Sequence, residues 1–138
     1  MRSGVKQFMS VLFITLILGV ISSASAADFD KAMDALLDGD LETGVSKLEV
    51  LAEQGHAKAQ NTLGVLYGSD TGIPQDYAQA ANWHRKAAQQ GNAVSQFSLG
   101  NMYLEGLGVS QDYAQAANWF RKAAEQGISI AQSGPRYI

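Results

Sequence analysis

The chain of 138 residues has no cysteine, only two prolines and only two histidines. Without cysteine there is no disulfide, and the thiolate ligands of most structural zinc sites are missing. Neither His56 nor His84 belongs to a two-histidine helical ligand pattern. The Gly-x-Ser-x-Gly and Ser-x-x-Lys motifs of serine enzymes are also missing. These absences predict no metal, no cofactor and no catalytic residue.

Positive charge is scarce where a nucleic acid would need it. Residues 28–56 contain eight acidic side chains and only two lysines, whereas residues 57–138 contain five acidic and six basic ones. No basic stripe exists, so a nucleic-acid partner is excluded. The acidic residues lack the spacing of a calcium loop. We interpret them as a solvated polar cap, with a docking patch for a basic partner as the alternative.

No hydrophobic run is long enough to span a bilayer. Arg2 and Lys6 precede an apolar run over residues 8–21, and about 14 apolar residues fall short of the ~20 that a membrane helix needs. Small residues follow, with Ala24 and Ala26 in the Ala-x-Ala pattern. We therefore predict that residues 1–26 are a signal peptide cleaved between Ala26 and Ala27. The expected product is periplasmic or secreted, without a membrane segment.

What the chain does contain is a repeat. The string QDYAQAANW occurs at 75–83 and again at 111–119, and residues 57–92 match residues 93–128 at 21 of 36 positions without a gap. Residues 27–56 fit the same frame as a degenerate first hairpin, and residues 129–138 form a short tail. One such unit cannot bury its apolar face alone, so the copies are expected to stack.

Each unit predicts two helices separated by a glycine-containing turn. In the first helix, Ala59, Leu63 and Leu66 recur at helical spacing. Asp76 and Asp112 occupy the N-cap positions of the second helices. We expect the alanines of the second helix to face Gly64, and Tyr67, Tyr77 and Trp83 to fill the remaining gaps. The side expected to be buried consists of Tyr77, Ala80, Ala81, Trp83, Ala87 and Ala88.

The two histidines are given structural roles. His84 aligns with Phe120 in the repeat and is expected to be a half-buried ring packed between helices. His56 follows Gly55 at a helix end, where we expect a surface residue whose positive charge the helix dipole favours.

The strings LGVLYGSDTGIPQDYAQAANWHRKAAQQG and LGNMYLEGLGVSQDYAQAANWFRKAAEQG resemble the Sel-one-like repeat (SLR) family, a relative of the tetratricopeptide solenoids. The resemblance implies an all-α, right-handed α-solenoid of stacked antiparallel helical hairpins with a 36-residue period. It also implies a protein that binds other proteins. The matching structural positions are Leu63, Gly64, Tyr67, Tyr77, Trp83 and Gly91 in the first copy, and Leu99, Gly100, Tyr103, Tyr113, Trp119 and Gly127 in the second.

The end of the sequence departs from the pattern. Pro135 stands where Leu63 and Leu99 stand in the two copies, and proline in a helix interior costs about 3 kcal/mol or more. We therefore expect no closing helix after residue 128. A partner protein or self-association through this uncapped repeat would then cover the last unit. A shortened remnant is the alternative.

The two copies differ mainly in their first helices and turns, which we expect to face a partner. By the resemblance, first helices line the concave surface of the solenoid. The candidate partner-binding face comprises Asn61, Val65 and Gly68 in one unit and Phe97, Asn101 and Leu104 in the next. Exposed Phe97 and Leu104 would form a hydrophobic anchor. In the alternative, the tail covers both.

The function predicted from these observations is an exported protein-binding adaptor or scaffold without catalysis of its own. The alternative from another class is a hydrolase or cell-wall-modifying accessory protein. Some cysteine-rich relatives of the family have been described as hydrolysing β-lactams, but this chain lacks their cysteines.

Overall fold

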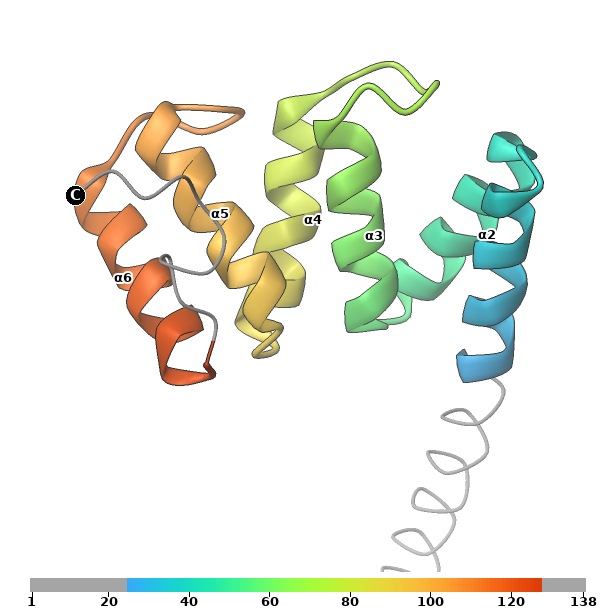
Figure 1. Cartoon of the computed structure of the whole chain (residues 1–138), viewed down its shortest axis with the longest axis horizontal. Helices are drawn as coiled ribbons and strands as arrows, with labels where there is room; N and C mark the ends of the chain where they lie inside the picture. Colours follow the sequence, from blue (N-terminus) through green and yellow to red (C-terminus); the bar gives the residue numbers. More distant parts are fainter. Residues whose placement is uncertain (1–24, 128–138) are drawn as a thin grey trace, which may run out of the picture.

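The computed structural model describes residues 25–127, and every regular element in that range is a helix (Figure 1). Residues 25–37 are helical and precede α2 (Leu41–Glu53), α3 (Ala57–Gly68), α4 (Tyr77–Gln89), α5 (Ala93–Glu105) and α6 (Tyr113–Glu125). Within this range no helix has the length and apolar character needed to cross a membrane. The calls on residues 1–24, on Pro135 and on the tail 129–138 lie outside the described residues.

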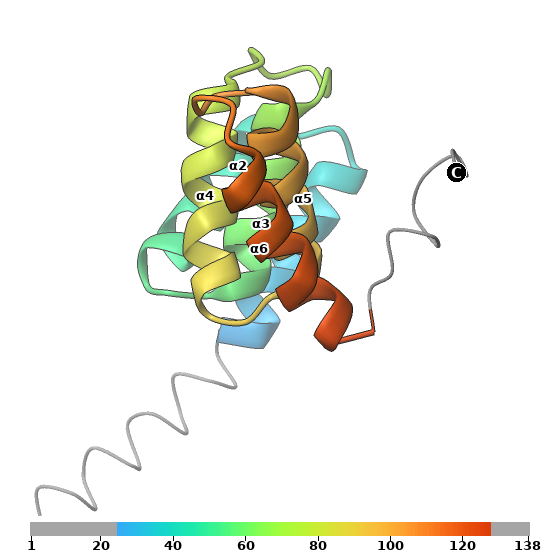
Figure 2. The same ribbon diagram turned by 90° about the vertical axis from the view of Figure 1, so that its left-hand side faces the viewer.

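The helices pack as successive hairpins that stack into an all-α solenoid, as the sequence predicts. Helix α3 packs on α4 and α5 packs on α6, while α4 also packs on the α5 of the next unit. Figure 1 shows this order along the long axis, and in Figure 2 the hairpins overlap one behind another, with α6 nearest the viewer. Leu48, Leu63 and Leu99 are fully buried between the layers.

A polar side chain caps the start of every helix from α2 to α6. Asp40, Asp76 and Asp112 each accept a hydrogen bond from the backbone N–H three residues later, at 3.0–3.1 Å. The N-cap roles expected for Asp76 and Asp112 are therefore confirmed. Asn92 does the same for α5, through a bond of 2.9 Å from the N–H of Ser95. These caps satisfy backbone donors that the helix itself leaves free.

His56 caps α3, which corrects the expectation for this residue. Its Nδ1 accepts a hydrogen bond from the N–H of Ala59 at 3.2 Å, and its ring stacks on Phe29 with centroids 5.2 Å apart. Burial lowers the pKa of His56. The end of the helix that it occupies is the positive, amino-terminal end, so the dipole disfavours its charge rather than favouring it. The neutral ring is the form that can cap.

In each of the two repeat units, an aromatic ring of the second helix covers a glycine of the first helix. Gly64 faces the ring of His84 and Gly100 faces the ring of Phe120, whereas Gly68 is the glycine next to Ala80. The side chain nearest to Gly64 is therefore the ring of His84, where an alanine was expected. A ring reaches further across the gap between the two helices than a methyl group does, so it is the ring that needs a glycine opposite.

The tyrosines at the start of the second helices do not belong to the buried side. Tyr77 is 37% exposed and Tyr113 is 65% exposed, which corrects the expectation for Tyr77 as a gap-filling core residue. Both are the first residue of their helix, so they lie at the edge of the layer. Tyr67, by contrast, is half-buried and donates a hydrogen bond to Glu49 at 2.9 Å.

Candidate functional site: a groove between α3, α4 and α5

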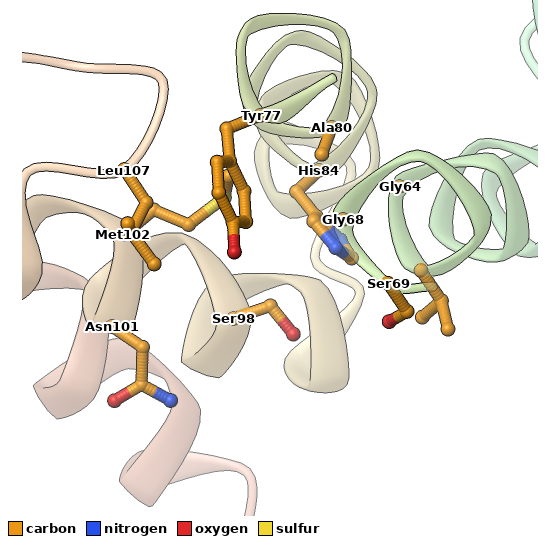
Figure 3. A pocket seen from close by; sticks show the side chains of 11 residues that line it. Gly64, Gly68, Ser69, Tyr77, Ala80, His84, Ser98, Asn101, Met102 and Leu107 are labelled. Carbon is orange, nitrogen blue, oxygen red and sulfur yellow. The ribbon is translucent and has the colours of Figure 1, made fainter. Parts of the chain in front are cut away.

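A groove of about 220 Å³ lies where α3, α4 and α5 meet (Figure 3). Two glycines of α3, Gly64 and Gly68, leave room for it, and Ala80 of α4 adds only a methyl group. The other side chains that line the groove combine apolar surface with uncharged hydrogen-bonding groups. They are Val65, Ser69, Tyr77, His84, Ser98, Asn101, Met102 and Leu107.

The repeat builds this groove from two consecutive units. Helices α3 and α4 belong to the first copy, and α5 and Leu107 belong to the second. The turn after α5 is held close by Gly108, whose φ of +67° suits glycine. A Cβ atom on Gly108 would collide with the backbone carbonyl of Tyr77. The close approach of this turn therefore sets one wall of the groove.

A buried polar network fixes the three helices relative to one another. The hydroxyl of Ser95 on α5 donates to Asn61 Oδ1 on α3 at 2.7 Å, and His84 Nδ1 on α4 lies 3.5 Å from the same hydroxyl oxygen. His84 is 5% exposed, and burial lowers its pKa to about 4. At neutral pH the ring is uncharged. His84 therefore adds no positive charge to the groove at neutral pH.

The structure brings three of the six residues of the candidate face into the groove and places the other three elsewhere. Val65, Gly68 and Asn101 line the groove, and Val65 is 45% exposed. Asn61 instead accepts the hydrogen bond from the Ser95 hydroxyl. Phe97 is half-buried and packs on Phe120 with ring centroids 5.4 Å apart, whereas Leu104 is 39% exposed and lies outside the groove lining.

Eight lining residues lie outside the candidate face that the sequence predicts: Gly64, Ser69, Tyr77, Ala80, His84, Ser98, Met102 and Leu107. Tyr77 and His84 were assigned to packing because both lie on the helix whose sequence is repeated. Met102 lies four residues before a glycine and carried no motif. The spacing of Tyr77 and His84, seven residues apart on one helix, is the signal that could have placed both on one face.

The lining residues have the composition of a binding surface. None of them is an acid, a lysine or an arginine, and His84 and Tyr77 are its titratable groups. In the range 25–127, no group of three histidine or carboxylate side chains is placed to hold a metal ion. Apolar walls with a few convergent hydrogen-bonding groups are typical of sites that hold a ligand or a peptide segment.

The acidic amino-terminal region lies apart from the groove. Asp28, Asp30, Asp34 and Asp38 are exposed, and Asp28 forms a surface ion pair with Lys31 at 3.6 Å. Asp40 has its pKa lowered by the hydrogen bonds from Thr43 that make it a cap. This arrangement agrees with a solvated polar face at the first hairpin.

Comparison with solved structures identifies similar proteins. A Sel1 repeat protein from Oxalobacter formigenes is 35% identical, with a TM-score of 0.65, over 71% of this chain and 40% of its own. A protective antigen present in uropathogenic Escherichia coli strains, displaying an SLR fold, is 39% identical, with a TM-score of 0.71, over 83% of this chain and 25% of its own. This chain thus spans less than half the length of either.

The fold also matches cysteine-rich protein B of Helicobacter pylori, with a TM-score of 0.61 and 24% identity over 66% of this chain and 68% of that one. At that identity the likeness shows the fold alone. No curated protein sequence matches the chain. The family model of the Sel1 repeat matches residues 57–92 and 93–128, which together make up more than half of the sequence. This chain belongs to the Sel1 repeat family.

Proposed function

We propose that the protein is an exported adaptor that binds a segment of a partner protein in the groove between α3, α4 and α5. The groove itself is the observation that carries the proposal, because it combines open apolar surface with Tyr77, Ser98 and Asn101 as hydrogen-bonding groups. Proteins with Sel1 repeats commonly bind other proteins. A scaffold role without catalysis is typical of the family.

The lining favours an uncharged partner segment. A charged side chain placed in the groove would find no opposite charge among the lining residues and would lose solvation. An extended segment with apolar side chains could cover Val65 and Met102 while its backbone amides pair with Asn101 and Ser98. Such a segment contributes through its main chain and through one or two buried anchors.

A matched pair of valine substitutions tests the groove. Val65 in the groove is 45% exposed and Val94 on α5, outside the lining, is 50% exposed, so Asp at either position should leave the fold intact. Tagged protein would be cross-linked in the native envelope and captured with its partners. We expect Val65→Asp to reduce capture of a specific partner at least fivefold and Val94→Asp to leave it unchanged. Equal capture by both variants would exclude the groove as the contact surface.

Export is tested separately by the mature amino terminus. Cleavage after Ala26 predicts Ala27 as the first residue of protein recovered outside the cytoplasm, and mass spectrometry of the intact chain measures this directly. Replacing Ala26 with a bulky residue should block cleavage because the Ala-x-Ala pattern requires small side chains. Recovery of the uncleaved chain in the cytoplasm alone would contradict the export proposal and leave the groove proposal standing.

A further inference from the structure

Helices α4 and α6 have nearly the same sequence but different surroundings. They differ only at residues 84 and 89 and their counterparts 120 and 125. Three positions are buried in both helices. They are Ala80, Trp83 and Ala87 in α4, and the equivalent Ala116, Trp119 and Ala123 in α6. Three more are buried in α4 alone: Ala81, His84 and Ala88. The positions buried in both helices are covered by their own unit. The positions buried in α4 alone are covered by the next unit.

The counterparts of that second set are not buried. Ala117 and Ala124 are exposed and Phe120 is partly exposed, whereas Ala81 and Ala88 are 1% and 2% exposed. We call Ala117, Phe120, Arg121 and Ala124 the α6 stacking face. Residues 117, 120, 121 and 124 follow helical spacing and so share one side of the helix.

Helix α5 covers the corresponding face of α4. The contacts of α5 show which groups a helix needs in order to cover such a face. Gln96 Nε2 donates to the carbonyl oxygen of Ala88 at 3.1 Å, as Gln60 Nε2 donates to that of Ala52 at 2.9 Å one unit earlier. Arg85 Nη2 donates to the Tyr103 hydroxyl at 3.3 Å. The covering helix therefore supplies a glutamine amide and a phenol seven residues apart.

Within residues 25–127, no helix covers the corresponding groups of α6. The carbonyl of Ala124 occupies the register position of Ala88 and Ala52, and Arg121 occupies that of Arg85. Arg121 instead donates to Asn118 of its own helix at 2.7 Å. The alanines allow a second helix axis to approach to the close end of the usual range of 8–10 Å.

We propose that the α6 stacking face binds a helix of another protein that carries the pattern Gln-x-x-Leu-Gly-x-x-Tyr. This is the pattern of the two helices that begin the repeat units of this chain, Gln60 to Tyr67 and Gln96 to Tyr103. The partner is thus the first helix of another repeat unit of the same kind. The face continues the interface that already joins α2 to α3 and α4 to α5. It is separate from the groove, since no residue of α6 lines the groove.

A peptide with the sequence of residues 92–106, held helical by a bridge between its positions 94 and 98, is the probe. Its binding to the full exported chain would be measured by calorimetry. We expect one peptide per chain and at least a tenfold weaker affinity for Ala117→Asp, because a carboxylate would then be desolvated at the interface. Ala124→Asp should act in the same way. A peptide with Gln96→Ala or Tyr103→Phe should also bind more weakly, since each loses one hydrogen bond.

Ala114→Asp is the matched control, because residue 114 is exposed and its counterpart Ala78 stays exposed even inside the stack. It carries the same substitution on the same helix and should change affinity less than twofold. Val65→Asp, which disrupts the groove, should also leave peptide binding unchanged. Thermal melts of all variants check that each remains folded.

Three outcomes would overturn the proposal. One is equal binding by Ala117→Asp, Ala114→Asp and the unchanged chain. Another is a dimer of the chain alone that Ala117→Asp dissociates and the peptide does not enter, which would identify a second copy as the occupant. The third is binding only to a chain that ends at Gly127, which would assign the face to residues 128–138.

Discussion

The imidazole ring of His84 packs so closely against the backbone of Gly64 that a Cβ atom on residue 64 would lie 2.6 Å from His84 Cε1. The second unit repeats the relationship, with Phe120 placed so that a Cβ atom on Gly100 would lie 2.8 Å from its ring. In both repeat units, a ring on the second helix needs a glycine on the first. The glycine is therefore required for packing, although glycine in a helix interior normally costs about 0.8–1.0 kcal/mol relative to alanine.

Gly64→Ala is expected to lower the free energy of unfolding by about 1–3 kcal/mol, because the added methyl group overpacks a buried ring. Gly68→Ala is the control in the same helix, since its Cβ would meet only Ala80 at an ordinary 3.4 Å. That variant should be unchanged or more stable by up to about 1 kcal/mol. Chemical denaturation of both proteins measures the difference. Equal stability of the two would contradict the ring–glycine relationship.

Acid should destabilise the protein through His84. Its pKa is about 4 in the folded chain, below the 6.5 of an exposed histidine, because burial disfavours the charged ring. The unfolded chain therefore takes up the proton more readily. The stabilisation is complete above pH 6.5 and is lost as the pH falls from 6.5 to about 4, by roughly 3 kcal/mol in total. Denaturation at a series of pH values measures this loss.

Two substitutions taken from the repeat itself should remove that pH dependence. His84→Phe copies Phe120, and Ser95 keeps its hydrogen bond to Asn61. His56, whose pKa is also lowered by burial, adds to the effect in the same direction, and His56→Asn copies the cap Asn92. The double variant should show a nearly constant free energy of unfolding between pH 7 and pH 5. A slope as steep as that of the unchanged protein would place the titrating group elsewhere.

The buried Gln60 is hydrogen-bonded to the exposed Gln90, and the two glutamines should differ in importance for stability. Gln60 is 3% exposed, donates to the carbonyl of Ala52 at 2.9 Å and accepts from Gln90 Nε2 at 2.8 Å. Gln60→Met keeps the volume and removes both bonds, so we expect a loss of about 1–3 kcal/mol. Gln90 is exposed, and Gln90→Ala should cost less than about 1 kcal/mol because water can replace its amide. Thermal unfolding of the two variants checks the order.

The equivalent turns of the two units should respond differently to alanine. Gly72 and Gly108 both have positive φ, of +93° and +67°, so alanine is strained at either position. A Cβ atom on Gly72 would meet the end of the Leu41 side chain at 2.8 Å, whereas on Gly108 it would collide with the backbone of Tyr77. Because a side chain can move aside and a helix backbone cannot, Gly108→Ala should be the more destabilising. Denaturant midpoints of the two variants measure this, and a larger loss for Gly72→Ala would contradict the reasoning.

Local signals in the sequence were sufficient for the helices and for two of the five N-caps from α2 to α6. Asp76 and Asp112 could be placed as N-caps because a carboxylate ahead of an apolar periodic segment is a common start signal. His56 could not, since histidine is not among the preferred capping residues and its role follows only from the neutral form favoured by burial. The aligned residue Asn92, a preferred cap, was the available hint.

The sequence by itself determined the repeat, its helical content and the residues that each hairpin buries internally, because these depend on periodicity and spacing within about 36 residues. Tertiary structure alone decided what depends on the neighbouring unit. Identical alanines are buried in α4 and exposed in α6, Asn61 turns inward to Ser95, and the groove forms where three helices of two units meet. The physical reason is that burial depends on contact between neighbouring helices. Identical residues are therefore buried or exposed according to which helix packs on them.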